Sequence, residues 1–242
     1  MPKVDKGVVR RAIVTPDKHA PLQDVPAINV VKKAIEIVKP DIYIDLGDLG
    51  EWGSVSHWQW KRKKKPPLEY ILPRVDSDVE AVNDLLDEID ESLDKANCKT
   101  KHFCAGNHDE WLNYFVQEYP YLDKYNLEKA CKFKQRKYTF HEAGKYLKIG
   151  KLYYYHGHHC GGQYHHSMQQ DSVTHMDGTK SAWSMGCLKD MDSDKNRWLG
   201  GRQHKWAHAF AIVDYYEGGH FTVHPIQIIK GQASLWGELI KG

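Results

Sequence analysis

The sequence DIYIDLGDLGE at residues 41–51 decides the fold. Its first six residues are largely apolar and predict a short buried strand, and polar side chains follow directly where that strand ends. Before it, apolar residues at helical spacing predict a helix over residues 25–38, and β-branched residues predict a strand over residues 8–15. A strand, a helix and a strand in so short a span predict a βαβ unit with parallel strands.

The same alternation continues downstream and then stops. An acidic amphipathic helix is predicted over residues 76–95 and a third strand over 100–105, with an irregular stretch before them at 51–74. After residue 138 the pattern becomes mostly antiparallel. The fold class is therefore α/β, with a βαβαβ half followed by a β-rich half. The later predictions are helices at 109–118 and 127–133, a hairpin at 146–156, and strands at 180–188, 207–215 and 221–229.

Length and composition limit the class of protein. The chain has 242 residues, 41% of them hydrophobic and 27% charged, which suits one domain over residues 1–242 with a loop insertion at about 51–75. No apolar run is long enough to span a membrane, and the polar N-terminus does not resemble a signal peptide. Five scattered cysteines without a CxxC pair predict reduced thiols and a cytoplasmic location. The net charge of +2 indicates no particular partner.

Ligand-type side chains follow each predicted strand of the first half. They are Asp17 and His19, then Asp48 and Glu51, then Asn107, His108 and Asp109, and, after a later strand, His156. Carboxyl ends of neighbouring strands in an open α/β sheet meet at one crevice. A set of Asp, His and Asn side chains suits Mn, Fe, Zn or Co better than metals that prefer thiolates.

These elements resemble the calcineurin-like metallophosphoesterase superfamily. Its pattern of D-x-H, GD, GNH-D/E and a His before Gly is matched in order by Asp17-Lys18-His19, Gly47-Asp48, Gly106-Asn107-His108-Asp109 and His156-Gly157. The resemblance implies a sandwich of two packed mixed sheets flanked by helices. It also implies hydrolysis of phosphate esters by a hydroxide shared between two divalent metals, Mn before Fe, Zn, Ni, Co or Mg.

The resemblance further implies a role for each matched residue. Asp17 and His19 would bind the first metal, Asp48 would bridge both metals, Asn107 and His156 would bind the second, His108 would act on the phosphate, Asp109 would orient His108, and Glu51 would support the ligands. The family's last element, GHxH, is missing here. His166 is the first candidate to replace its ligand to the first metal. His165 and His158 are candidates for the second metal, and His175 is a weaker one.

A basic, tryptophan-rich loop follows the Asp48 element. It contains Trp58 and Trp60 and then the run Lys61, Arg62, Lys63, Lys64 and Lys65. Aromatic rings stack on bases and cations bind phosphates, so this loop favours a phosphodiester or nucleic-acid substrate, DNA or RNA, over a monoester. A solvated loop whose tryptophans pack as a lid is the alternative.

Three hypotheses follow for the function. The first is a metal-dependent phosphoesterase. The second is a catalytically impaired module that binds nucleic acid or nucleotides on the same fold, because GHxH is missing. The third is that a partner protein or a second copy of the chain completes the site. The sequence gives no direct sign of the oligomeric state.

Overall fold

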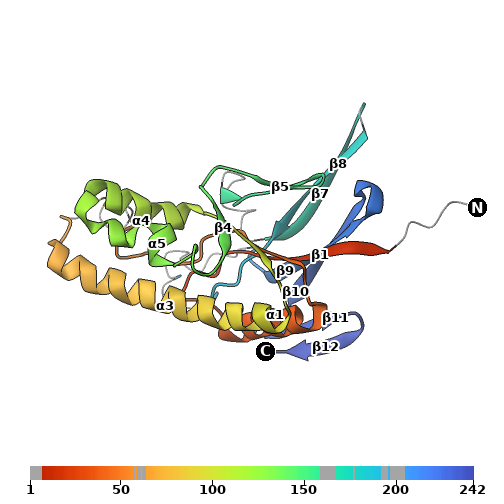
Figure 1. Cartoon of the computed structure of the whole chain (residues 1–242), viewed down its shortest axis with the longest axis horizontal. Coiled ribbons are helices and arrows are strands. Elements are labelled where there is room, and N and C mark those ends of the chain that lie inside the picture. Colours follow the sequence, from red (N-terminus) through yellow and green to blue (C-terminus); the bar gives the residue numbers. More distant parts are fainter. Residues whose placement is uncertain are drawn as a thin grey trace, which may run out of the picture.

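A six-stranded mixed sheet forms the centre of the computed structural model, which describes residues 7–56, 58, 61, 64–158, 167–176, 178–191, 196 and 205–242 (Figure 1). The strand order is β10-β9-β1-β2-β3-β4. The first four strands along the chain run parallel, whereas β9 and β10 are antiparallel to their neighbours. The strands are β1 (Val8–Thr15), β2 (Ile42–Asp45), β3 (Thr100–Cys104), β4 (Tyr138–His141), β9 (His208–Tyr216) and β10 (Phe221–Ile228).

The helices pack on one face of this sheet. Asp24 caps α1 (Val25–Val38) by accepting a hydrogen bond of 2.7 Å from the Ala27 N–H. The long helix α3 (Leu68–Lys95) lies beside α1, and the same hydrophobic core takes in α4 (Asn107–Glu118) and the single turn α5 (Leu127–Ala130) (Figure 1). A 3-10 helix, η1 (Pro120–Tyr125), joins α4 to α5. Among the described helices, none combines the length and apolarity needed to cross a membrane.

Both faces of the sheet are buried. Ile13 and Tyr43 belong to the core on the helical face, whereas their neighbours Ala12, Val14 and Ile44 belong to a second core on the opposite face. Side chains alternate between the two faces of a strand, so a strand covered on both sides is apolar at successive positions. This explains the nearly continuous apolar runs of β1 and β2, and it confirms the α/β fold with a mixed sheet flanked by helices.

The second core lies under two hairpins. They are β5 (Leu147–Ile149) with β6 (Leu152–Tyr154), and β7 (Met168–His175) with β8 (Gly178–Met185). Within the described residues, the expected second sheet takes the form of these separate two-stranded hairpins. A further hairpin, β11 (Gln232–Leu235) with β12 (Glu238–Lys241), packs beside α1 on the helical side.

The main difference from the sequence prediction is the start of α3. The stretch 51–74 is not irregular throughout, because α3 begins at Leu68 and contains Pro73. Ile71 and Val75 are fully buried and extend the apolar stripe of the helix towards its N-terminus. That burial outweighs the backbone hydrogen bond that a proline removes. The strands β4, β7, β11 and β12 were also missed.

Candidate metal centre

The carboxyl ends of β1, β2 and β3 meet at one edge of the sheet. Asp17 follows β1, Asp48 follows β2, and Asn107 begins α4 directly after β3. His156 reaches the same place from β6, which belongs to a hairpin outside the central sheet. Asp17, Asp48 and His156 are at most 3% exposed. Parallel pairing of the three strands thus brings together residues far apart in the sequence.

Two glycines allow the β2 and β3 loops to touch. A Cβ on Gly106 would lie 2.2 Å from Asp48 Oδ1, and a Cβ on Gly47 would lie 2.3 Å from the Cys104 carbonyl oxygen. Gly47 also has a φ of +88°, which glycine adopts most readily. The glycines of the GD and GNHD motifs are therefore required by close packing of the two loops.

Three of the ligand-type residues have a left-handed backbone. Asp17, His19 and Asp48 have φ values of +26°, +53° and +47°. Non-glycine residues rarely adopt such values, and the strain persists only where surrounding contacts impose it. Here the N–H groups of Lys18 and His19 both donate to the Asp48 carbonyl oxygen, at 3.1 and 2.9 Å, which ties the two loops together.

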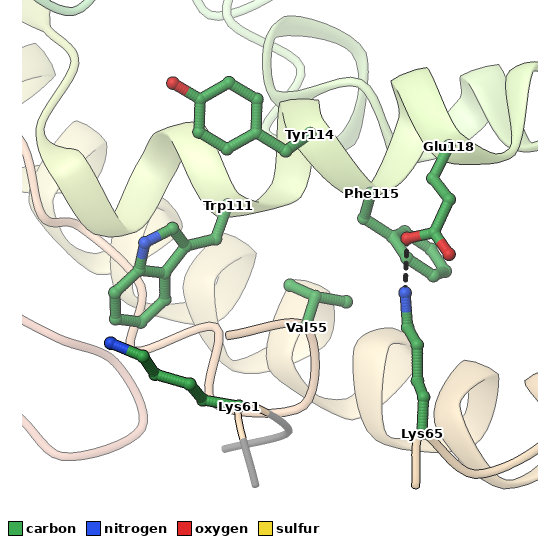
Figure 2. A pocket seen from close by; sticks show the side chains of 7 residues that line it. All are labelled: Val55, Lys61, Lys65, Trp111, Tyr114, Phe115 and Glu118. Carbon is green, nitrogen blue, oxygen red and sulfur yellow. Dashed lines mark hydrogen bonds and ion pairs between the residues drawn. The ribbon is translucent and has the colours of Figure 1, made fainter. Parts of the chain in front are cut away.

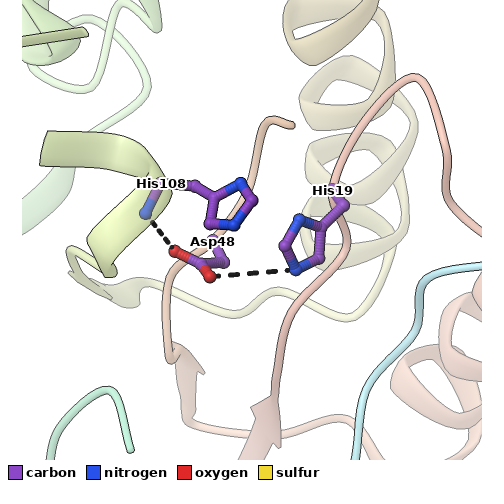
Figure 3. Close-up of side chains that lie close together, drawn as sticks. All are labelled: His19, Asp48 and His108. Atoms are coloured by element: carbon purple, nitrogen blue, oxygen red, sulfur yellow. Dashed lines mark hydrogen bonds and ion pairs between the residues drawn. The ribbon is translucent and has the colours of Figure 1, made fainter. Parts of the chain in front are cut away.

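The side chains form two overlapping groups around Asp48. Ligand atoms of Asp17, Asp48 and His156 all lie within 4.8 Å of one another, and so do those of His19, Asp48 and His108. Figure 3 shows the second group, in which Asp48 interacts with the backbone nitrogen of His108 and with the ring of His19. Asp48 alone is shared by both groups. Asp17 and His19, expected together at the first metal, fall into different groups, and His108, expected to act on the phosphate, falls into one of them. These oxygen and nitrogen donors fit hard or borderline divalent metals.

His156 is oriented by the backbone of β2. Its Nδ1 lies 2.7 Å from the Leu46 carbonyl oxygen, and because a carbonyl oxygen only accepts, Nδ1 carries the proton. Nε2 then faces Asp48 Oδ2 at 3.3 Å and Asn107 Oδ1 at 3.2 Å. Burial opposes the charged form of His156, but Asp48 and Asp17 outweigh it and raise the pKa of the ring to about 10. The two carboxylates thus create a strong preference for positive charge at Nε2.

Glu51 contacts His19 on the side of the ring that faces away from Asp17 and Asp48. Its Nδ1 is 2.9 Å from Glu51 Oε2, and its Nε2 faces Asp48 Oδ2 at 3.8 Å and Asp17 Oδ1 at 3.9 Å. Lys189 contacts the same Glu51 oxygen at 2.9 Å. Burial opposes ionisation of Glu51, but His19 and Lys189 lower the pKa of its carboxyl to about 2. A histidine that binds a metal usually donates its other ring N–H to an acceptor such as a carboxylate, which fixes the orientation of the ring.

His108 is placed differently from the other histidines. Its backbone N–H donates to Asp48 Oδ1 at 2.8 Å, and its Nδ1 donates to the Glu51 carbonyl oxygen at 3.0 Å. Its ring lies on the Trp111 indole, with centroids 3.8 Å apart. Burial lowers the pKa of His108 to about 4. The ring is therefore neutral near pH 7 with Nε2 unprotonated, until negative charge beside it raises that pKa.

Asp109 supports the loops rather than the His108 ring. Its carboxylate accepts backbone N–H groups of Asp48 at 2.8 Å, Leu49 at 3.3 Å and Gly106 at 2.9 Å, and the Trp52 indole N–H at 3.1 Å. The expected orientation of His108 by Asp109 is thus replaced by contacts from the Glu51 carbonyl and Trp111. Asp109 is fully buried, so it fixes the two loops that carry Asp48 and Asn107.

Two of the four candidates for the missing GHxH element, His158 and His175, lie within the described residues. His158 lies beside His156, with ring centroids 5.4 Å apart. His175 is at the turn end of the β7–β8 hairpin, paired with Gly178. His165 and His166 lie outside the described residues, as do Trp60, Arg62 and Lys63 of the basic loop.

Three supporting residues were not found by sequence reasoning. Lys189 forms an ion pair with Glu51, the Trp52 indole N–H donates to Asp109, and the Trp111 ring packs against the ring of His108. Trp111 lies one helical turn after His108, which was a usable signal. No sequence feature indicated Lys189, because its position depends on the segment after β8. There the Leu188 N–H donates to the Asp17 carbonyl oxygen at 2.8 Å.

Comparison with known protein families agrees with this geometry. A model of the calcineurin-like phosphoesterase family matches residues 11–220, so the chain belongs to that family of metal-dependent phosphoesterases. No curated protein matches the sequence. Among solved structures, the chain is similar to a single mutant of Vps29 from Entamoeba histolytica, at 11% identity over 96% of this chain and 99% of the other, with a TM-score of 0.45. A further solved structure matches at 12% identity over 58% of this chain and 49% of its own, with a TM-score of 0.34.

Proposed function

We propose that this chain hydrolyses phosphate esters at the Asp48 cluster, with phosphodiesters or nucleic acid favoured over monoesters. The observation that carries the proposal is the pair of ligand groups that share Asp48. Divalent cations, when bound there, supply Lewis-acid polarisation of phosphoryl oxygens and a water of lowered pKa. Asp17, His19, Asp48, Asn107 and His156 are the residues that would hold them, with Mn²⁺ the first metal to test.

His108 is the residue proposed to act on the phosphate. Its Nδ1 proton is committed to the Glu51 carbonyl, so Nε2 is the atom that exchanges a proton. A bound phosphate adds negative charge beside the ring and raises its pKa, which allows Nε2 to take up a proton and pass it to the leaving oxygen. Glu51, which is paired with Lys189, holds His19, and Asp109 holds the backbone of both loops.

The preference for diesters depends on the basic loop. Within the described part of the loop, Lys61 and Lys65 line a hollow beside α4, and Trp58 is 61% exposed. Exposed aromatic and cationic side chains fit a polymeric or base-bearing phosphate better than a small monoester. This supports the substrate-loop interpretation over a packed lid.

A catalytically impaired nucleotide-binding module is the second candidate. The sequence feature that favours it is the missing GHxH, because the matched motifs then provide fewer histidines than the family pattern. A cytoplasmic location is proposed for either function, since the four cysteines in the described residues are free and buried.

The deciding experiment measures hydrolysis of bis-p-nitrophenyl phosphate and p-nitrophenyl phosphate after chelation and Mn²⁺ add-back. Asp48→Ala and His108→Ala should abolish the restored activity, whereas His220→Ala, an exposed histidine in the β9–β10 turn, should retain it. The ratio of the two rates separates diesterase from monoesterase. A folded protein that stays inactive with Mn²⁺, Fe²⁺, Zn²⁺, Ni²⁺, Co²⁺ and Mg²⁺ would contradict the proposal and favour the binding module.

A further inference from the structure

A hollow of about 400 Å³ lies between α4 and the basic loop (Figure 2). One wall is aromatic and comes from α4, where Trp111, Tyr114 and Phe115 line it. Its volume falls within the range of about 300–1,000 Å³ that is usual for small-molecule sites. The hollow is thus large enough for a planar ring system. Trp111 and Tyr114 offer partly exposed rings on which it can stack, whereas Phe115 is only 3% exposed and has the Lys65 ammonium over its ring.

The opposite wall is polar. Lys61 and Lys65 enter from the basic loop, and Lys65 forms an ion pair with Glu118 at the far end of α4 (Figure 2). Two lysines from the loop and one glutamate from α4 leave the lining with one excess positive charge. The Lys65–Glu118 pair offers both hydrogen-bond donors and acceptors at one place, which is what the edge of a nucleobase requires. An alkyl group would satisfy none of them.

Trp111 links the lining of the hollow to the proposed catalytic residues. The indole lines the hollow and also contacts the ring of His108, with centroids 3.8 Å apart. His108 in turn lies edge-on to His19, at 4.6 Å between centroids. A group bound in the hollow is therefore one aromatic ring away from the residue proposed to protonate the leaving oxygen.

We propose that this hollow is a base-binding subsite: it takes the nucleobase of a nucleotide whose phosphate lies at the Asp48 cluster. The base stacks on the aromatic wall, its edge meets Lys65 and Glu118, and Lys61 provides positive charge towards the sugar and phosphate. This inference rests on the proposed function for the phosphate position, and it adds the chemical class of the group attached to that phosphate.

The test compares adenosine 5′-monophosphate with ribose 5-phosphate by titration calorimetry on the full chain with Mn²⁺ present. The two ligands share the sugar and the phosphate, so only the base distinguishes them. Stacking of a base on aromatic residues predicts that the nucleotide binds about ten-fold more tightly. Trp111→Ala should bring the ratio of the two affinities close to one.

A second variant guards against a folding defect in Trp111→Ala. Tyr114 is 53% exposed, so Tyr114→Ala removes part of the wall without opening the core, and it should also lower the ratio. Tyr121→Ala is the matched control: it removes a 74% exposed tyrosine outside the hollow and should leave the ratio at its wild-type value. Equal affinities in the wild type, binding of neither ligand, or a ratio that survives both wall variants would each overturn the subsite.

Hydrolysis of bis-p-nitrophenyl phosphate by the same preparation separates this inference from the proposed function. Metal-dependent hydrolysis without a preference for the nucleotide would overturn the subsite alone. A clear preference for the nucleotide without hydrolysis would support the subsite and contradict the phosphoesterase proposal.

Discussion

The carboxylate of Asp109 accepts the backbone N–H of Asp48 at 2.8 Å, although 61 residues separate the two in sequence. The same carboxylate accepts three further N–H groups, from Leu49, Gly106 and Trp52. One buried side chain therefore fixes the loop after β2 against the first turn of α4. The positions of the proposed metal ligands depend on it.

Removing this carboxylate is expected to destabilise the fold. Asp109→Ala leaves four buried donors without an acceptor, and we expect the free energy of unfolding to fall by about 3–5 kcal/mol. Asp109→Asn retains one accepting oxygen and should lose less. Urea unfolding followed by tryptophan fluorescence measures both. A loss below about 1 kcal/mol for Asp109→Ala would show that the four hydrogen bonds contribute little.

Metal binding should be visible as thermal stabilisation. After chelation, Mn²⁺ at 100 times its Kd should raise the Tm of the wild type by about 5–10 °C, because binding to the folded state alone stabilises it. Asp48→Asn removes the charge shared by both ligand groups and should abolish most of the shift. Asp84→Asn, an exposed position on α3, should keep it. Equal shifts in the wild type and in Asp48→Asn would argue against a site at Asp48.

Lys189 should act on metal affinity through Glu51. Lys189→Met removes the cation beside the Glu51 carboxylate, which holds His19, and the affinity for Mn²⁺ should fall by about 10–100-fold. Lys134→Met is a matched control, since Lys134 is an exposed lysine. Calorimetric titration of both variants with Mn²⁺ gives the comparison. If the two variants bind Mn²⁺ equally, Lys189 has no supporting role.

Breaking the buried ion pair between Lys18 and Asp45 should make the loss of stability depend on pH. Lys18 Nζ lies 2.8 Å from Asp45 Oδ2, and both side chains are fully buried. Burial raises the pKa of Asp45 even with Lys18 present, so Lys18→Met should raise it further. At pH 7.5 the variant should lose about 3–5 kcal/mol of stability.

The sign of that pH dependence follows from the protonated form. A carboxyl whose folded-state pKa lies above its unfolded value stabilises the fold at low pH and loses this contribution as pH rises. The deficit of Lys18→Met relative to the wild type should therefore be smaller at pH 5 than at pH 7.5. Lys18→Met combined with Asp45→Leu should show no such difference. Parallel deficits at both pH values would contradict the buried-charge explanation.

The basic loop should control how nucleic-acid binding depends on salt. Changing Lys61, Arg62, Lys63, Lys64 and Lys65 together to Ala should weaken DNA or RNA binding and flatten its dependence on salt concentration. Lys65→Ala alone should change the slope less than Lys61→Ala alone, because Glu118 already neutralises Lys65. Fluorescence anisotropy at several salt concentrations measures both. Unchanged binding by the five-residue variant would remove the nucleic-acid interpretation.

The sequence predicted the first half of the fold closely. Apolar periodicity defined β1 and α1 at their observed bounds, because one element is buried on both faces and the other shows a clear helical stripe. Prediction failed where tertiary contacts set an element's boundary. The predicted helix began at residue 76, but burial of Ile71 and Val75 extends α3 back to Leu68. The strand β4 was missed because pairing with β3 supports a segment of only four residues.

The sequence by itself determined the family, the succession along the chain of the strands that carry the site, and the residue types that could hold metals. These follow from motifs and periodicity, which are local properties of the chain. Only the tertiary structure decided that Asp109 fixes two loops, that Lys189 supports Glu51, and that Trp111 joins His108 to a hollow under the basic loop. Such contacts connect distant segments of the chain or depend on which face of a helix meets which loop. Tertiary packing determines both of these, and no local sequence pattern encodes them.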